Sequence, residues 1–276
     1  MLSVLRRIGA HPRVEPYVAH ALRSRAVRPS LPFFLGEVRG RGEREYTVRA
    51  NGARILIEHG TSDAATFDQA FISRVYEPSS EAAAALEALV RPPVILDLGA
   101  NIGLFSVWAQ NRWPGARIKA VEPLERNVRQ LRRQLELTLQ PGTWEVVAAA
   151  ATTADGEVTF VLDDGDTFAE GRIAEDAGHG GNALTVPARD VFKLAEGVDL
   201  LKIDIEGAEW PILADERFSA DVAPVVMLEH HPAGAPGGTT PEEAAERALR
   251  EAGYEVQRTV TEGPGAGIVW GVRADG

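Results

Sequence analysis

VILDLGANIG, residues 94–103, is the stretch of this sequence that decides the fold. A run of branched apolar residues ends in Asp97. Two glycines, Gly99 and Gly103, then enclose a short turn before the apolar-rich segment LFSVWAQ. A short apolar run, glycines and a longer apolar segment in this order predict a buried parallel strand, a tight turn and a helix.

This strand, turn and helix would form a ligand site. Glycine permits close backbone approach, and a helix N-terminus presents unpaired N–H groups. The series Gly99, Asn101, Gly103 lacks the G-x-G-x-x-G spacing of dinucleotide sites, and Asp97 would repel a pyrophosphate. A carboxylate there suits an amino group, such as that of the methionine moiety of S-adenosylmethionine. The structural alternative is that Asp97 only caps the helix.

Composition limits the class of protein. The 276 residues are 45% hydrophobic and 25% charged, which is typical of a globular protein with one full-size α/β domain and an appendage. No stretch approaches the roughly 20 apolar residues of a membrane span. The formal net charge of −11 argues against nucleic acid and favours a small-molecule acceptor. We therefore expect neither a membrane nor a nucleic-acid partner.

The chain has no cysteine, which excludes disulfides, thiolate metal sites and a cysteine nucleophile. Two arginines in the first ten residues argue against a secretory signal peptide, and we expect a cytoplasmic protein. The sequence does not indicate an oligomeric state.

Two parts are expected along the chain, residues 1–60 as an N-terminal arm with a β-hairpin and residues 61–276 as the main domain. Up to Gly40 there are seven arginines and two acidic residues, which predicts a basic, loosely packed arm. An Asn51-Gly52 pair between YTVRA and ARILIE predicts the hairpin. The spacing of Phe67, Phe71 and Val75 then predicts an amphipathic helix with Tyr76 near its end.

Strands and helices alternate after the glycine turn. Residues 116–122 predict a second strand that ends in Glu122, 23 residues beyond Gly99, where a carboxylate can accept ribose hydroxyls. A helix at 124–135 and a third strand at 144–151 complete the pattern of a parallel, doubly wound sheet. GEVTFVLDDGD and ALTVPARDVF predict an inserted strand pair. His179, in the loop between them, is expected to be solvated rather than a base.

Acidic residues follow the next buried strand. In DLLKIDIEGAEWPIL, residues 199–213, the strand ends at Asp204, and Glu206 and Glu209 stand at the start of a helix. The carboxyl ends of parallel strands face the ligand crevice, so Asp204 and Glu206 are expected beside the ligand of the glycine turn. Helix capping and the helix dipole are the structural alternative for Glu206 and Glu209.

A fifth strand, VVMLEHH, ends in Glu229, His230 and His231. A histidine there could act as a general base for a hydroxyl, and a carboxylate could bind a divalent cation; Asp204 and Glu229 are the candidate metal ligands. PAGAPGG, residues 232–238, predicts a lid. A capping box at Thr240 begins a helix, and YEVQRTV and GIVWGV predict a closing antiparallel pair.

VILDLGANIGLFS, AVEP and LLKIDIEGAEWPIL, in this order and spacing, resemble the FkbM family of S-adenosylmethionine-dependent methyltransferases. The similarity extends from about Asp63 to Val272. It implies an α/β class I methyltransferase fold, Rossmann-like, with a seven-stranded mixed sheet and helices on both faces. It also implies O-methylation of a hydroxyl on a sugar or secondary-metabolite acceptor.

The resemblance also implies roles for particular residues. Asp204 and Glu206 would line the active centre, with His230 or His231 as the general base that deprotonates the acceptor. The residues that would hold S-adenosylmethionine are Tyr76, Asp97, Gly99, Asn101, Gly103 and Glu122. The third strand departs from the family pattern, because AAAATT offers no acidic or amide side chain near the adenine.

Other functions stay open. Within the enzyme class, carboxyl or N-methylation of a small molecule or peptide is an alternative. A nicotinamide-dependent oxidoreductase is disfavoured by the missing middle glycine and by Asp97. A non-catalytic nucleotide-binding module would fit if the second motif only caps a helix.

Overall fold

The computed structural model describes residues 15–138, 143–162, 171–173, 182–263 and 265–274. The chain divides into two compact units, Met1–Arg74 and Val75–Gly276. The first unit ends at Arg74, beyond the boundary predicted at residue 60, and it includes the helix that follows the hairpin. His179 lies outside the described residues. Among the described helices, none combines the length and the apolar character that crossing a membrane requires.

The first unit contains a three-stranded sheet and helices. Its elements are α2 (Glu15–Arg25), β1 (Val27–Arg28), α3 (Ser30–Arg39), β2 (Glu43–Val48), β3 (Arg54–Glu58), α4 (Asp63–Asp68) and the π-helix η1 (Gln69–Ser73). Strands β2 and β3 pair antiparallel, which confirms the hairpin. The prediction of a loosely packed arm is wrong for residues 15–40, because they form helices and Phe33 is fully buried against Tyr46 and Phe67.

The helix after the hairpin is shorter than predicted. It ends at Ser73 because Arg74 adopts a left-handed backbone conformation with a φ of 55°. Tyr76 therefore lies beyond the helix. Its ring is buried, and it packs edge-on against Phe105 and Trp108.

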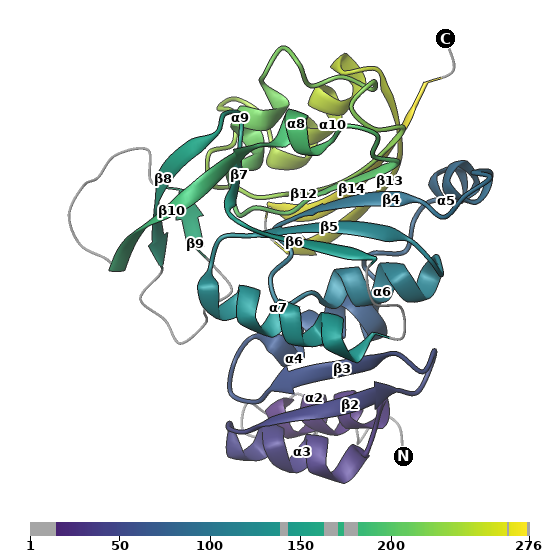
Figure 1. The fold of residues 1–276 in the computed structure, drawn as a ribbon, viewed down its shortest axis with the longest axis vertical. Helices are drawn as coiled ribbons and strands as arrows, with labels where there is room; N and C mark the ends of the chain where they lie inside the picture. Colours follow the sequence, from purple (N-terminus) through teal and green to yellow (C-terminus); the bar gives the residue numbers. More distant parts are fainter. Residues whose placement is uncertain (1–14, 139–142, 163–170, 174–181, 264, 275–276) are drawn as a thin grey trace. The chain divides into compact units, whose positions relative to one another are not determined.

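The second unit is built on a seven-stranded sheet in the order β13-β14-β12-β11-β4-β5-β6 (Figure 1). The strands are β4 (Val94–Leu98), β5 (Arg117–Glu122), β6 (Trp144–Ala148), β11 (Leu200–Ile203), β12 (Val225–His230), β13 (Tyr254–Gly263) and β14 (Ala266–Arg273). Strands β4, β5, β6, β11 and β12 run parallel, whereas β14 is antiparallel to both of its neighbours. This seven-stranded mixed sheet confirms the fold expected from the sequence.

Helices cover both faces of this sheet. In Figure 1, α6 (Leu104–Arg112) and α7 (Glu125–Leu137) lie on one side, and α8 (Val191–Leu194), α9 (Glu209–Leu213) and α10 (Pro241–Glu251) lie on the other. Helix α5 (Ser80–Glu87) packs against β12 and β14. The strands in the middle of the sheet are mostly apolar because both of their faces are covered. Every residue of β11 and β12 is buried.

A smaller sheet stands beside the large one. Its order is β7-β10-β8-β9, with β7 (Ala150–Thr152), β8 (Gly156–Leu162), β9 (Gly171–Ile173) and β10 (Asn182–Asp190). Strands β8 and β10 pair antiparallel, which confirms the inserted strand pair. The capping box at Thr240 and the closing pair β13–β14 are also confirmed.

The chain order of the sheet reverses between β4 and β11, which lie side by side. In a parallel sheet the loops that leave two such strands diverge and form a crevice at their carboxyl ends. The two loops touch at Gly99, where a Cβ atom would lie 1.7 Å from the carbonyl oxygen of Asp204. The glycine turn and the acidic motif therefore meet at one edge of the sheet.

The requirement for glycine at position 99 can be measured against a matched position. Gly99 and Gly197 have φ angles of 74° and 72°, but a Cβ at Gly197 would meet nothing within 4 Å. We expect G197A to lower the free energy of unfolding by about 1 kcal/mol, the cost of the left-handed conformation. G99A should cost at least about 2 kcal/mol more, because the added methyl overlaps backbone. Urea denaturation measures both, and equal losses would contradict the close approach.

Candidate active site

The glycine turn is held by backbone hydrogen bonds from β5. The N–H groups of Gly99 and Ala100 both donate to the carbonyl of Val121, at 3.0 and 2.9 Å. Asn101 has a φ of 49°, and its N–H donates to Glu122. The turn leads directly into α6, so the unpaired N–H groups of that helix lie next to it. The predicted strand, turn and helix are confirmed.

Asp97 is completely buried at the end of β4. One carboxylate oxygen accepts a hydrogen bond of 2.7 Å from the hydroxyl of Ser106, and the other lies 3.1 Å from the ammonium of Lys202. Helix α6 has no side-chain cap, so the alternative that Asp97 caps it is wrong. The amino group that Asp97 faces in the protein belongs to Lys202. A contact with the cofactor's amino group stays a prediction.

Lys202 connects the two motifs, and sequence reasoning missed it. Its ammonium lies 3.1 Å from carboxylate oxygens of both Asp97 and Asp204, and it donates to the carbonyl of Gly99. Burial by itself lowers the pKa of Lys202, but the charges of Asp204 and Asp97 outweigh burial and raise that pKa above its ordinary value. A lysine inside the apolar strand LLKI, beside two motif aspartates, was the available signal.

Glu122 ends β5 and braces the loops around it. Its carboxylate accepts hydrogen bonds from the N–H groups of Asn101 and Leu124 and from the side-chain amide of Asn127. Burial raises the pKa of Glu122 to about 7, and these hydrogen bonds oppose the rise. A ribose hydroxyl would be a further donor to this carboxylate, which is the role that the sequence predicts.

The acidic motif and the end of β12 meet in a cluster of charges. One ligand-type atom from each of Asp204, Glu206 and His231 lies within 4.8 Å of the others. His231 Nε2 is 3.4 Å from a Glu206 oxygen and 3.7 Å from a Glu229 oxygen. The predicted residues Asp204, Glu206, Glu229 and His231 are thus brought together.

Glu209 holds His231 and the turn at Gly207 in place beside this cluster. It is fully buried and accepts hydrogen bonds from the N–H groups of Gly207 and His231 at 2.7 and 2.8 Å. It also lies 3.2 Å from His231 Nδ1. Burial by itself lowers the pKa of His231, but the hydrogen bond to Glu209 and the charges of Glu206 and Asp204 raise it to about 9.

His230 lies apart from the cluster. Successive side chains of a strand point to opposite faces, so His230 is directed away from Glu229 and His231. The side chain is buried, and burial lowers the pKa of His230.

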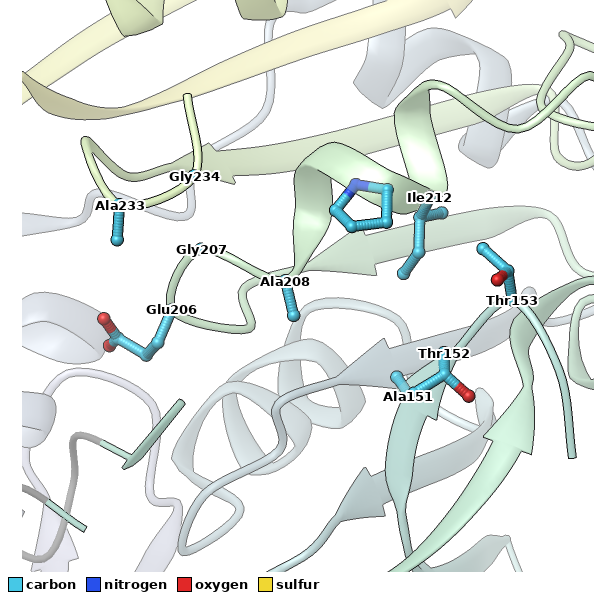
Figure 2. A pocket seen from close by; sticks show the side chains of 10 residues that line it. Ala151, Thr152, Thr153, Glu206, Gly207, Ala208, Ile212, Ala233 and Gly234 are labelled. Carbon is cyan, nitrogen blue, oxygen red and sulfur yellow. The ribbon is translucent and has the colours of Figure 1, made fainter. Parts of the chain in front are cut away.

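A pocket of about 320 Å³ opens next to the cluster (Figure 2). In the view of Figure 2, Glu206 lies at one end, and Thr152 and Thr153 lie at the other. Ala233 and Gly234 of the predicted lid also line the pocket. Of the predicted site residues in the described part of the chain, Glu206 alone lines this pocket.

The profile of the methyltransferase FkbM domain matches residues 97–256, which is more than half of the chain. The chain belongs to the FkbM methyltransferase family. The match begins at Asp97 and includes the glycine turn, Glu122, the acidic motif and both histidines.

Two curated relatives match part of this chain. Methyltransferase sdnD of Sordaria araneosa is 30% identical over 176 residues, covering 51% of this chain and 68% of that protein. AMB antimetabolite synthetase AmbE of Pseudomonas aeruginosa is 29% identical over 234 residues, covering 69% of this chain. The alignment with AmbE takes in only 10% of that protein's length.

Among solved structures, magnesium protoporphyrin IX methyltransferase of Synechocystis is 14% identical, with a TM-score of 0.44. The match covers 76% of this FkbM-family chain and 83% of the other.

The raised pKa of Glu122 makes stability depend on pH. Because the pKa rises from 4.5 to about 7, the folded FkbM domain binds this proton more tightly than the unfolded chain. The resulting stabilisation is complete below pH 4.5 and is lost as the pH rises through 7. For a shift of this size it amounts to about 3 kcal/mol.

E122Q, which is always neutral, isolates this contribution. We expect the free energy of unfolding of E122Q, minus that of the wild type, to rise by up to about 3 kcal/mol between pH 5 and pH 8. Urea denaturation of both proteins at several pH values measures it. A difference that does not change with pH would show that the pKa of Glu122 is ordinary.

Proposed function

We propose that this FkbM-family chain is an S-adenosylmethionine-dependent O-methyltransferase whose acceptor is a hydroxyl of a sugar or another secondary metabolite. The observation that carries the proposal is Lys202, which joins the glycine turn to the acidic cluster through Asp97 and Asp204. In this proposal the glycine turn is the cofactor half and the acidic cluster is the reacting half of one site at the switch point of the sheet.

The glycine turn fits the proposed cofactor. Gly99 and Gly103 leave the backbone bare where it approaches its surroundings most closely, and α6 directs N–H groups toward the turn. Glu122 is positioned to accept ribose hydroxyls, and Asn101 is fixed beside it. Asp97 accepts a hydrogen bond from Ser106 of α6. Tyr76 packs against Phe105 and Trp108 of the same helix.

When bound, S-adenosylmethionine supplies a methyl group that passes from its sulfonium sulfur to the acceptor oxygen, and the C–S electron pair stays on sulfur. The protein's residues hold the acceptor in line, which accounts for most of the acceleration. They also accept the hydroxyl proton. We propose that His231, or a carboxylate oxygen of Asp204 or Glu206 beside it, accepts that proton.

The acceptor is proposed to be a small molecule. Small side chains line much of the pocket, and its volume of about 320 Å³ suits a compact group. The name of AmbE, an antimetabolite synthetase, supports a place in secondary metabolism. The net charge of −11 disfavours nucleic acid, and the composition supports a cytoplasmic location and no membrane partner.

Cofactor binding tests the first half of the proposal. We expect S-adenosylhomocysteine to bind the wild type in isothermal titration calorimetry. E122Q should weaken that binding 10- to 100-fold, because a charged acceptor of ribose hydroxyls is lost. E125Q is the matched control. Glu125 is the exposed first residue of α7, and among the described ion pairs it pairs only with Arg129. Binding of NADH without S-adenosylhomocysteine would instead support the oxidoreductase.

Turnover tests the second half. With radiolabelled S-adenosylmethionine and a panel of hydroxylated, carboxylated and amine acceptors, we expect label on a hydroxyl. D204N should lower kcat by 10²- to 10⁴-fold, because a proposed proton acceptor is altered. D221N, an exposed aspartate elsewhere in the unit, is the control. Transfer to carboxylates or amines alone would contradict O-methylation, and undiminished turnover of D204N would remove Asp204 from the mechanism.

A further inference from the structure

His231 has an arrangement that proton transfer alone does not require. One ring nitrogen, Nδ1, faces the buried carboxylate of Glu209 at 3.2 Å. The other, Nε2, faces oxygens of Glu206 and Glu229 at 3.4 and 3.7 Å. A bare lone pair and carboxylate oxygens repel each other at such distances, so a cation is required between them. That cation is either a proton on Nε2 or a metal ion.

Glu209 sets which ring nitrogen is presented. Both of its oxygens are occupied, one by the N–H of Gly207 and the other by the N–H and ring of His231. Metal-binding histidines commonly donate their second ring N–H to a carboxylate, which fixes the tautomer and the ring orientation. In this arrangement Nδ1 carries the proton that faces Glu209, and Nε2 is the nitrogen available to bind a cation.

The set of candidate ligands converges on one point. Asp204 from the end of β11, Glu206 from the following turn and His231 from the end of β12 each bring one ligand atom within 4.8 Å of the other two. Three atoms at about 2.0–2.3 Å from a common ion lie up to about 4 Å apart, so small side-chain rotations suffice. Their side chains are 20%, 37% and 12% exposed, which leaves coordination positions open on the solvent side.

We propose that Asp204, Glu206 and His231 bind one divalent metal ion, with Glu209 as the residue that orients His231. Two carboxylates favour oxygen-preferring ions, and one imidazole favours transition metals, so Mn²⁺ suits the mixed set. Of the two ligands named from the sequence, Asp204 belongs to this site. Glu229 adds negative charge beside it.

The metal would act on the acceptor. A hydroxyl bound at an open position of the ion would lose its proton more readily, because the ion stabilises the alkoxide. This step rests on the proposed function, whereas metal binding itself does not.

Metal binding can be measured without turnover. The full chain is stripped with EDTA, dialysed and titrated with MnCl₂, while the electron paramagnetic resonance signal of free Mn²⁺ reports the unbound ion. We expect one tight site per chain. E206Q and H231Q should each weaken it at least tenfold. E216Q is the control, because Glu216 is exposed and stands outside the cluster. Circular dichroism checks that each variant is folded, and E206Q alters a side chain that is 37% exposed.

Two results would overturn the metal site. One is no saturable binding of Mn²⁺, Mg²⁺ or Zn²⁺ by the wild type, which would leave a proton on His231 as the cation. The other is binding that E206Q and H231Q both leave unchanged, which would place the ion elsewhere. Titration with S-adenosylhomocysteine on the same samples separates the proposals. Cofactor binding without metal binding removes only the metal site, and metal binding without cofactor binding removes the proposed methyltransferase function.

Discussion

The site depends on one buried ammonium, that of Lys202, placed between the carboxylates of Asp97 and Asp204. Two carboxylates at the ends of neighbouring strands would repel each other in a low-dielectric interior, and each would be costly to bury alone. Removing one partner of such a buried pair typically costs about 3–5 kcal/mol, since a charge is left unpaired. Lys202 therefore allows the acidic ends of β4 and β11 to coexist, and its bond to the Gly99 carbonyl fixes the turn between them.

The same principle recurs around this edge of the sheet. Glu122 and Glu209 are buried carboxylates that accept backbone N–H groups from the loops leaving the strands, so each holds a loop in place rather than pointing into solvent. The groups left partly exposed are Asp204 and Glu206. A buried layer thus positions the glycine turn and the strand ends, and Asp204 and Glu206 form a more accessible layer next to it.

Much of this could be predicted from sequence because it follows local pattern. Branched apolar runs gave the strands, the inserted pair and the closing pair, and Gly99 and Gly103 located the turn. The errors arose where tertiary context decides. The basic segment before Gly40 folds because the Phe33 side chain is buried. No hydrophobic periodicity in that segment predicts this burial. Lys202 was missed because a lysine in an apolar strand acts through neighbours that are distant in sequence. Which of His230 and His231 faces the cluster could be decided only once the position of the strand in the sheet was known.

Acceptor choice cannot be inferred from these motifs for a physical reason. The motif residues Asp97 and Asp204 pair with Lys202, and Glu122 accepts backbone N–H groups, so these side chains shape the proposed cofactor half of the site. The pocket beside Glu206 is lined instead by Ala151, Thr152 and Thr153 on one side and Ala233 and Gly234 on another. These small side chains supply few directional hydrogen bonds, so discrimination there rests on shape, where one methylene in a pocket is worth only about 1–3 kcal/mol. In the proposed function, the charged cluster therefore carries the reaction type, and the loops around it carry acceptor identity.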